Sequence, residues 1–512
     1  MPKTPWSHMR LTRLAGPLPA WQGLVDHAGW RAACARCQAD GGRLVSLWGT
    51  DARHAAQGFL IHALLAWTDR LIWLTTRAGD ASPHYPDVSD IFPATAREQR
   101  ATADLLGLTC GSADARPWLR HDAWSAADFP LREDFTTATA ADAKPYPFLR
   151  VAGDGVHEIP VGPIHAGIIE PGHFHFSVVG DDVLRLEAHL GYAHKGVEKA
   201  FGSLSLADGS RLAGRICGDS TVAYTLAYVM AVEALDGYTV PPRAQALRAL
   251  LLERERIANH LGDIGALCGD GGLAFGQAQF GLLKEHWLQT HQKLFGHRYL
   301  MDTITVGGMA CDLSEADGVA MTAQCRELAG ALRALEEIVN DHAGLQERFL
   351  GTGTLTAEQV ERYNGVGLIA RAAGVGRDMR LEFPHAPYAD LPVQDTRRPE
   401  GDVAARVALR FAEMHASLEL VRHLLAALPD GPLASHCATT RHTRALGGAE
   451  GWRGEIFVAI ERHAADGSHR VHVHDPSWQN WPLLELAATD GLIPDFPLIN
   501  KSFNLAYSGH DL

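Results

Sequence analysis

The sequence has few cysteines, no long apolar run and no excess of positive charge. Its 8 cysteines in 512 residues leave little scope for a disulfide framework, and the start MPKTPWSHMR has no apolar signal-peptide core. No stretch approaches the roughly 18 apolar residues that a transmembrane helix needs. Acidic residues (60) outnumber basic ones (46), which gives a net charge of −14 and argues against a general nucleic-acid-binding protein. We therefore expect a protein of a reducing, cytosolic compartment that binds no nucleic acid.

Two cofactor signatures are also absent or weak. The sequence contains no glycine-rich loop of the P-loop or dinucleotide-binding type, so we expect no NAD site. The one C-x-x-C motif, Cys34 to Cys37, has no second pair and is by itself weak support for zinc or redox chemistry. Histidine, in contrast, is abundant, with 27 residues. This side chain serves proton transfer and metal binding, but also plain packing.

Residues 1–147 show short apolar runs of both strand and helix type, which predict an α/β domain. The expected strands are Leu44–Thr50 and Arg70–Thr76, and the expected helices are Ala55–Trp67 and Thr95–Leu106. The segment Thr136–Pro147 is small, polar and proline-bearing, which is typical of a linker. It predicts a domain boundary after residue 147.

Residues 148–512 predict a mainly helical bundle with small β-sheets, so the whole chain is expected to be of the α+β class. The expected helices are Ser220–Leu235, Arg243–Leu267, Phe280–Phe295, Leu313–His342 (with Asp312 as its N-cap) and Val403–Leu428. The expected strands are the hairpin His173–Val179 and Val183–Glu187, then Gly454–Arg462 and His469–Pro476.

Three parts of the sequence carry more than generic patterning. They are IPVGPIHAGIIEPGHFHF (Ile159–Phe176) with GYAHKGVEKAF (Gly191–Phe201), GRICGDSTVAYTLAYVMAVEAL (Gly214–Leu235) with LERERIANHLGDIGALCGD (Leu252–Asp270), and IPDFPLINKSFNLAYSGHDL (Ile493–Leu512). In this order they resemble the large subunit of group 4 membrane-bound nickel–iron hydrogenases, the hydrogenase-4 and formate hydrogenlyase type. They are also similar to the D subunit of NADH:quinone oxidoreductase (complex I). DLLGL (Asp104–Leu108) and DFPLREDF (Asp128–Phe135) resemble the C subunit of the same complex, fused here to the rest of the chain.

The resemblance implies a central cavity, which in the hydrogenases holds nickel and iron between four thiolates. Two thiolates come from an R-x-C-G-x-C motif and two from a terminal C-x-x-C. Here the corresponding positions hold Cys217, Ser220, Ala506 and Gly509, so only one thiol is left. Because soft metals need soft ligands, we expect no nickel–iron centre and no metal bound by this chain. Cys217 is then a packed small side chain, or a contact of another ligand of the cavity.

In the complex I branch the resemblance implies a quinone head group in the same cavity, held by a histidine and a tyrosine. Those two positions fall on Ile169 and Gly218, so both usual quinone partners are absent. His173 and His175 follow closely, and we expect His173 to be able to substitute as a cofactor contact. A shift of one residue in the hairpin register would turn it away from the cavity.

The resemblance also places five polar residues around the cavity: His165, His194, Glu198, Arg215 and Asp219. We expect Glu198, His165, Arg215 and Asp219 to be the catalytic group. Glu198 falls on the glutamate that hydrogenases use as a proton gate, and a buried carboxylate with a raised pKa can relay protons. The alternative is a purely structural buried ion pair between Glu198 and Arg215. On a helix, Glu198 and His194 would share a face.

Two further pairs have plainer interpretations. Asp378 and Arg380 match a G-x-x-x-D-x-R pattern of the family, and we expect them to brace the bundle rather than to face a partner. His472 and His474 alternate on a predicted strand, so they share one face, and we expect solvent exposure.

The leading interpretation is a catalytic-core subunit of a membrane-associated redox complex. It would dock an iron–sulfur subunit similar to the B subunit of complex I, with a 4Fe-4S cluster in that partner, and would shape a cavity for electron and proton transfer. A quinone is one candidate ligand. Membrane-arm proteins similar to the H subunit of complex I and to antiporters would hold it peripherally on the cytoplasmic face of the inner membrane. The alternative is a non-catalytic scaffold for assembly and conformational coupling. The missing thiolates argue most strongly against a working hydrogenase.

Overall fold

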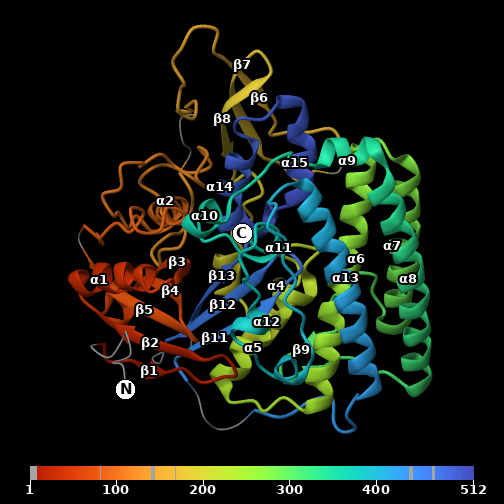
Figure 1. The fold of residues 1–512 in the computed structure, drawn as a ribbon. Helices are drawn as coiled ribbons and strands as arrows, with labels where there is room; N and C mark the ends of the chain where they lie inside the picture. Colours follow the sequence, from red (N-terminus) through yellow and green to blue (C-terminus); the bar gives the residue numbers. More distant parts are fainter. Residues whose placement is uncertain (1–8, 81, 140–143, 168, 438–441, 464–467) are drawn as a thin grey trace.

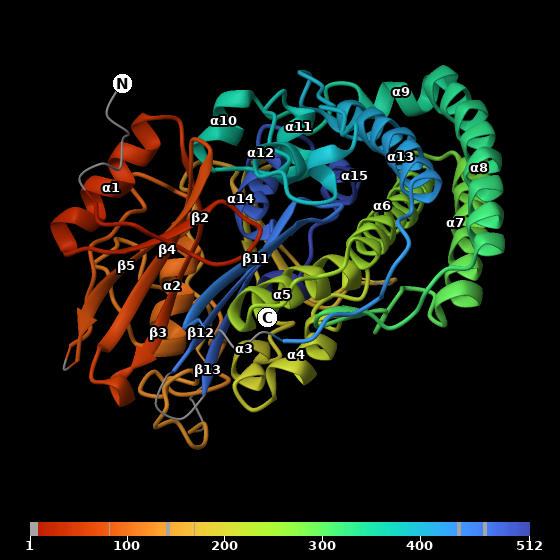
Figure 2. The same cartoon turned by 90° about the horizontal axis from the view of Figure 1, so that it is seen from below.

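The computed structural model describes residues 9–512 except 81, 140–143, 168, 438–441 and 464–467. Part of the predicted linker Thr136–Pro147 lies outside these described residues, and the boundary after residue 147 stays a prediction. The N-terminal sheet occupies one side of the molecule and a group of long helices the other, with a second sheet between them (Figures 1 and 2). This arrangement confirms the predicted α+β class.

The N-terminal part is a five-stranded sheet in the order β1-β2-β5-β4-β3, in which β2 and β5 are parallel and the other neighbours antiparallel. Its elements are β1 (Thr12–Arg13), β2 (Ala20–Leu24), α1 (His27–Ala39), β3 (Arg43–Ala52), β4 (Gly58–Trp67), β5 (Arg70–Gly79) and α2 (Thr95–Leu106), with a 3-10 turn at Arg53–Ala55. The predicted helix at Ala55–Trp67 is wrong. That segment is β4, which is buried along its whole length, and a fully buried strand shows no alternation that would distinguish it from a buried helix.

Long helices build the opposite side of the molecule, and they confirm the five helices predicted there. They are α5 (Thr221–Asp236), α6 (Pro242–Asp270), α7 (Ala274–Phe295), α8 (Glu315–Asp341) and α13 (Val403–Ala426). α6 packs on α7 and α13, and α8 packs on α7 and α13. The N-cap of α8 is Ser314, not Asp312 as predicted, because Ser314 accepts a hydrogen bond from the Asp317 amide in a capping box.

Three small sheets and several short helices complete the chain. The strands are β6 (His157–Val161), β7 (His173–Val179), β8 (Asp182–His189), β9 (Ile304–Thr305), β10 (Gly308–Met309), β11 (Arg444–Glu450), β12 (Glu455–Arg462) and β13 (His469–His474). The helices are α3 (Val197–Phe201), α4 (Leu206–Ala213), α9 (Ala343–Phe349), α10 (Ala357–Arg362), α11 (Gly367–Ala372), α12 (Met379–Glu382), α14 (Ser477–Ala488), α15 (Phe496–Phe503) and α16 (Ser508–Asp511), with 3-10 turns at Tyr388–Asp390 and Ile493–Asp495. The predicted β7–β8 hairpin is confirmed.

The sheet β11-β12-β13 joins the two sides of the molecule. Every residue of α5 except the last is buried, and the helix packs on β11 and β12. On the other side, β13 contacts β3 of the N-terminal sheet (Figure 2). Side chains of β13 and α14 both bind β3: His472 Nε2 lies 2.9 Å from the Ser46 hydroxyl, and Gln479 of α14 donates to the Val45 carbonyl at 2.6 Å. In the part of the chain that the structure describes, no helix is both long and apolar enough to cross a bilayer.

Candidate functional site

A cavity of about 500 Å³ lies where three distant parts of the chain meet. The β6–β7 connection supplies His165 and Ile169, the turn before α5 supplies Cys217 to Asp219, and α15 with the residues after it forms the opposite wall. We call it the Cys217 cavity. The resemblance predicted that His165, Asp219 and Cys217 come together around one cavity, and the structure places them there.

Asp219 is held in the wall of the Cys217 cavity by Arg453. Two guanidinium nitrogens donate to its two carboxylate oxygens at 2.7 and 2.6 Å, the bidentate arrangement that is strong for this pair. Burial would raise the pKa of Asp219, but the Arg453 charge outweighs burial and lowers the pKa to about 2. The Cys217 thiol donates to Asp219 at 3.0 Å, and burial raises its pKa well above the usual value. Cys217 is therefore a neutral thiol.

The four positions that correspond to the thiolates do not fit a four-thiolate metal centre, and of these four Cys217 alone is among the residues that line the cavity. The Ser220 hydroxyl accepts from Trp452 Nε1 at 3.0 Å, and Ala506 is buried without a donor atom. A Cβ atom at Gly509 would collide with the Tyr224 hydroxyl and lie 2.6 Å from an Asp475 oxygen. Among the residues that the structure describes, no three His, Cys, Asp or Glu side chains come together in a way that could hold a metal ion.

Glu198 lies outside the Cys217 cavity, in a second pocket between α3 and the N-terminal sheet. Its carboxylate binds Arg470 at 2.6 Å and His472 at 2.7 Å. Burial would raise the pKa of Glu198, but these two partners lower it to about 2. The expected raised pKa of Glu198 is therefore wrong, because the Arg470 guanidinium binds the carboxylate and the sequence did not predict this contact.

Arg215 does not pair with Glu198, so the proposed ion pair between them is also wrong. It binds Asp302 at 2.7 Å on a part of the surface where both side chains are about 40% exposed. His194 precedes α3 instead of sharing a helix face with Glu198, although both line the same pocket.

The histidines of the β6–β7 region divide between two faces. His165 lines the Cys217 cavity, with its Nε2 2.7 Å from the Gly172 carbonyl. His173 does not line it, because Phe174, its neighbour on β7, takes the inward position. His173 instead lies 3.1 Å from the Gly162 carbonyl and packs near Phe148, and burial lowers its pKa. The register therefore turns His173 away from the predicted contact with a ligand in this cavity.

Three other pairs singled out in the sequence are buried. Asp378 and Arg380 bind each other at 2.6 Å within the core, which is where bracing of the bundle requires them. His474 is buried and the His472 side chain is only 13% exposed against the N-terminal sheet, so the expected solvent exposure is wrong. Cys34 and Cys37 are buried on α1, and burial raises the pKa of Cys34 to about 12.

Sequence reasoning missed two residues that shape these sites and one buried carboxyl group that lies outside both of them. Arg453 and Arg470 fix Asp219 and Glu198, but each stands more than 200 residues from its partner, and no local pattern connects them. Glu255 on α6 accepts hydrogen bonds from the Val222 and Ala223 amides at the start of α5, at 2.7 and 3.1 Å. Burial raises the pKa of Glu255 to about 8, which is the range in which a carboxyl group exchanges protons near neutral pH.

Comparisons with known proteins agree along most of the chain. Residues 24–141 match the family model described as "Respiratory-chain NADH dehydrogenase, 30 Kd subunit", and residues 279–446 match the model for its 49 Kd subunit. Formate hydrogenlyase subunit 5 of Escherichia coli (strain K12) is 31% identical over 483 residues, which cover 92% of this chain and 85% of that protein. Hydrogenase-4 component G of the same organism is 29% identical over 481 residues, 92% of this chain and 84% of the relative.

One further relative and one solved structure extend the comparison. The fused C/D subunit of NADH-quinone oxidoreductase from Phocaeicola vulgatus is 26% identical over 454 residues, 84% of this chain and 87% of that protein. Among solved structures, a chain of the membrane-bound sulfane sulfur reductase, an archaeal respiratory membrane complex, superposes with a TM-score of 0.65 at 24% identity. The match covers 71% of this chain and all of that one, and it shows a shared fold.

Proposed function

The chain belongs to the family of fused 30-kDa and 49-kDa complex I-type proteins that includes formate hydrogenlyase subunit 5 and hydrogenase-4 component G, and from this premise we propose that it is a core subunit of a membrane-bound redox complex. The family membership confirms the resemblance seen in the sequence. The observation that carries the proposal is the Cys217 cavity, which keeps a carboxylate–guanidinium pair, Asp219 with Arg453, beside a thiol.

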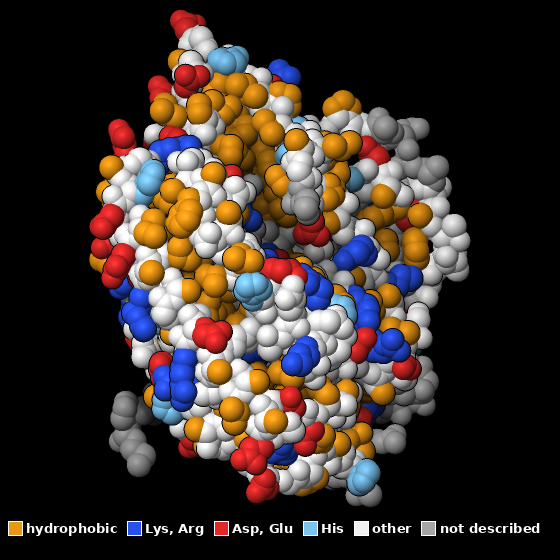
Figure 3. Space-filling view, turned by 90° about the vertical axis from the view of Figure 1, so that its right-hand side faces the viewer, with side chains coloured by type: hydrophobic (Ala, Val, Ile, Leu, Met, Phe, Trp, Pro, Cys, Tyr) orange, Lys and Arg blue, Asp and Glu red, His pale blue; other side chains and the backbone are white. Residues whose placement is uncertain are grey.

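We propose that an iron–sulfur subunit similar to the B subunit of complex I docks beside the Cys217 cavity and brings a 4Fe-4S cluster to it. The β6–β7 connection beside the cavity exposes two large apolar side chains, with Ile164 91% and Ile169 51% exposed. One face of the molecule is also hollowed in its upper half, with hydrophobic side chains gathered around the hollow (Figure 3). Exposed apolar surface of this kind is typical of a partner interface.

Membrane-arm partners similar to the H subunit of complex I and to antiporters would hold the complex on the cytoplasmic face of the inner membrane. The chain offers no membrane-crossing helix among its described residues, so attachment through partners is the mechanism we propose. Fractionation of cells that lack the neighbouring membrane subunits should move the chain from the membrane to the supernatant. Persistent membrane binding by the isolated chain would contradict it.

The docking proposal is tested by purifying the tagged chain from membranes. We expect an iron-containing subunit to copurify, and Ile164→Asp to reduce its recovery at least tenfold, because a charge is then buried in an apolar interface. Leu24→Asp is the matched control, since Leu24 is 60% exposed on the N-terminal sheet and its replacement should change nothing. Equal recovery with both variants would refute the docking site.

Within the assembled complex, the Cys217 cavity would accept an electron acceptor such as a quinone. Proton exchange would take place at Glu255, which lies outside the lining of the cavity and binds the Val222 amide three residues after Asp219, and not at Glu198. The pKa of Glu255, raised by burial to about 8, suits exchange near neutral pH, whereas the pKa of Glu198, about 2, does not. Glu255→Gln should therefore lower quinone-linked turnover of the purified complex more than Glu198→Gln does. An equal effect of the two changes would contradict this assignment.

The second candidate is a non-catalytic scaffold. It is favoured by the way Tyr224 and Asp475 fill the space beside Gly509, which closes one corner of the former metal position. Electron-transfer assays of the purified complex distinguish the two candidates. A complex that contains all its clusters but reduces no quinone or dye acceptor would support the scaffold. Turnover that depends on Asp219 would support the catalytic subunit. Asp219→Asn is the variant for that test, because it keeps the volume and removes the charge.

A further inference from the structure

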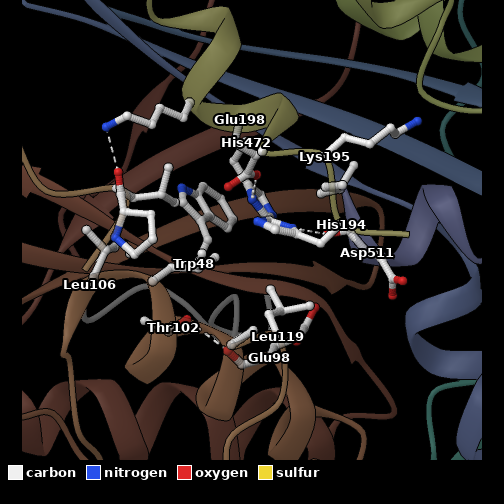
Figure 4. A pocket seen from close by; sticks show the side chains of 18 of the residues that line it. Trp48, Glu98, Thr102, Leu106, Leu119, His194, Lys195, Glu198, His472 and Asp511 are labelled. Carbon is white, nitrogen blue, oxygen red and sulfur yellow. Dashed lines mark hydrogen bonds and ion pairs between the residues drawn. The ribbon is translucent and has the colours of Figure 1, made fainter. Parts of the chain in front are cut away.

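A pocket of about 420 Å³ lies between the N-terminal sheet and the C-terminal part, and it shares no residue with the Cys217 cavity. Its floor comes from β3 and α2 and its opposite wall from α3, β13 and α14 (Figure 4). The volume falls within the range of small-molecule sites, which occur preferentially where two structural units meet. We call it the inter-sheet pocket.

Most of the inter-sheet pocket is apolar. Leucines from β3, α2 and the segment that follows line it, together with Trp48 and Trp478. The charged side chains at its edge already have partners: Glu198 binds Arg470, and Lys199 donates to the Pro130 carbonyl at 2.7 Å. These groups are therefore engaged before any ligand arrives.

Glu98 on α2 is different, because one of its oxygens is buried in the pocket wall without a partner. The side chain is 5% exposed. Its Oε1 accepts from the Ser46 hydroxyl at 3.2 Å, while Oε2 makes no hydrogen bond to any described residue. The nearest basic group is His474, whose Nδ1 lies 3.9 Å from Oε1, and burial keeps that imidazole neutral by lowering its pKa. Among the described residues no cation lies beside Glu98, and burial raises its pKa well above the usual range. A buried carboxyl group without a counter-charge is favoured in its neutral, protonated form, and in that form it is a hydrogen-bond donor.

Neighbouring side chains hold Glu98 in position. Ser46 binds Glu98 on one side and His472 on the other, at 2.9 Å, and His472 in turn binds Glu198 and stacks on Trp48 with ring centroids 4.5 Å apart. Figure 4 shows the Trp48 ring next to His472 and Glu198, with Glu98 on α2 below them in this view. An apolar pocket with one fixed polar group is the usual construction of a site that orients a small molecule.

We infer that the inter-sheet pocket binds a neutral, largely apolar molecule with a carbonyl oxygen, and that the Glu98 carboxyl group donates the hydrogen bond that orients it. The Trp48 and Trp478 rings and the surrounding leucines supply the apolar contact. This inference does not depend on the proposed function, because the Cys217 cavity and its ligand take no part in it.

The test uses the purified full-length chain and two matched probes, 2-acetylnaphthalene and 2-ethylnaphthalene, titrated by calorimetry. We expect each to bind the wild-type chain at one site. Ala101→Leu, which fills the pocket from α2, should weaken both at least tenfold. Ala103→Leu is the control on the same helix, because Ala103 is only half-buried and does not line the pocket, and it should leave both unchanged.

Glu98→Leu then tests the hydrogen bond. It should weaken 2-acetylnaphthalene about 5- to 10-fold, the size of effect expected for one hydrogen bond, and leave 2-ethylnaphthalene within twofold. The isotope-edited infrared spectrum of carbonyl-labelled 2-acetylnaphthalene bound to wild-type protein gives the same answer without a variant, since a hydrogen-bonded carbonyl absorbs at lower frequency than in an alkane. The inference is overturned if neither probe binds, if the two alanine variants behave alike, or if the bound carbonyl absorbs as it does in an alkane.

Discussion

Glu198→Gln removes the carboxylate that holds Arg470 and His472 where α3 meets β13. The side chain is 9% exposed and accepts three hydrogen bonds, including one from the Val473 amide. Burial alone would raise the pKa of Glu198, but its partners lower it from the ordinary 4.5 to about 2. Each tenfold change in proton affinity corresponds to about 1.4 kcal/mol, so the ionised carboxylate stabilises the folded chain by about 3 kcal/mol relative to its protonated form.

This stabilisation has a defined pH dependence. Because the pKa of Glu198 is lower in the folded chain than in the unfolded one, the stabilisation is fully present above pH 4.5 and is lost as the pH falls toward 2. At pH 7 the variant should therefore unfold in urea with a free energy about 3 kcal/mol lower than the wild type, since Arg470 is left buried without its counter-charge. The difference should become smaller at pH 3.5.

Urea titrations followed by circular dichroism at the two pH values check this result. Glu361→Gln is the control, because Glu361 is exposed on α10 and its amide should unfold like the wild type. A loss below 1 kcal/mol at pH 7, or a difference that does not narrow in acid, would refute the reasoning. A variant that assembles and unfolds normally but loses electron transfer would instead restore Glu198 as a proton relay.

Three further outcomes are expected. The chain purified from cells that make hydrogenase maturation factors should contain no stoichiometric nickel by elemental analysis, and one nickel per chain would contradict the donor set of the cavity. Gly509→Ala should lower the free energy of unfolding by about 1–3 kcal/mol in thermal unfolding, because the new methyl group meets the Tyr224 hydroxyl and lies 2.6 Å from an Asp475 oxygen. Adding Tyr224→Phe to this variant should recover part of the loss. An unchanged unfolding midpoint for Gly509→Ala would refute the clash. Burial raises the pKa of Cys34 to about 12, so this thiol should resist iodoacetamide at pH 8 while the exposed Cys437 reacts. If mass spectrometry finds Cys34 alkylated in the folded chain, α1 opens and the prediction is wrong.

The fold was predictable where the hydrophobic pattern has a period. The amphipathic helices α7 and α8 and the hairpin β7–β8 follow from such patterns, and the structure confirms them. The error at β4 has a physical cause: every residue of that strand is buried, so its sequence is a continuous apolar run with no period. Length and pattern alone cannot then separate a buried strand from a buried helix.

Only the site residues that stand in a recognised family motif could be predicted from the sequence. The resemblance placed Cys217, Asp219 and His165 around one cavity, and the structure brings them together. The partners that set their charge were not predictable, since Arg453 reaches Asp219 from a turn 234 residues later. Glu198 illustrates the consequence: its burial was foreseen, but the sign of its pKa change depends on Arg470, which no local pattern connects to it.

The packing around Gly509 gives a reason why a cysteine substituted there would not by itself be accommodated. Any side chain there needs the space that Tyr224 and Asp475 occupy, and the hydrogen bond between those two fixes both. Asp475 also accepts from the Ser477 amide at 2.7 Å, at the start of α14, so moving it would disturb that helix. A cysteine at 509 therefore requires a smaller residue at 224 first. The mismatch with the four-thiolate pattern therefore extends beyond the four positions to the side chains packed against Gly509.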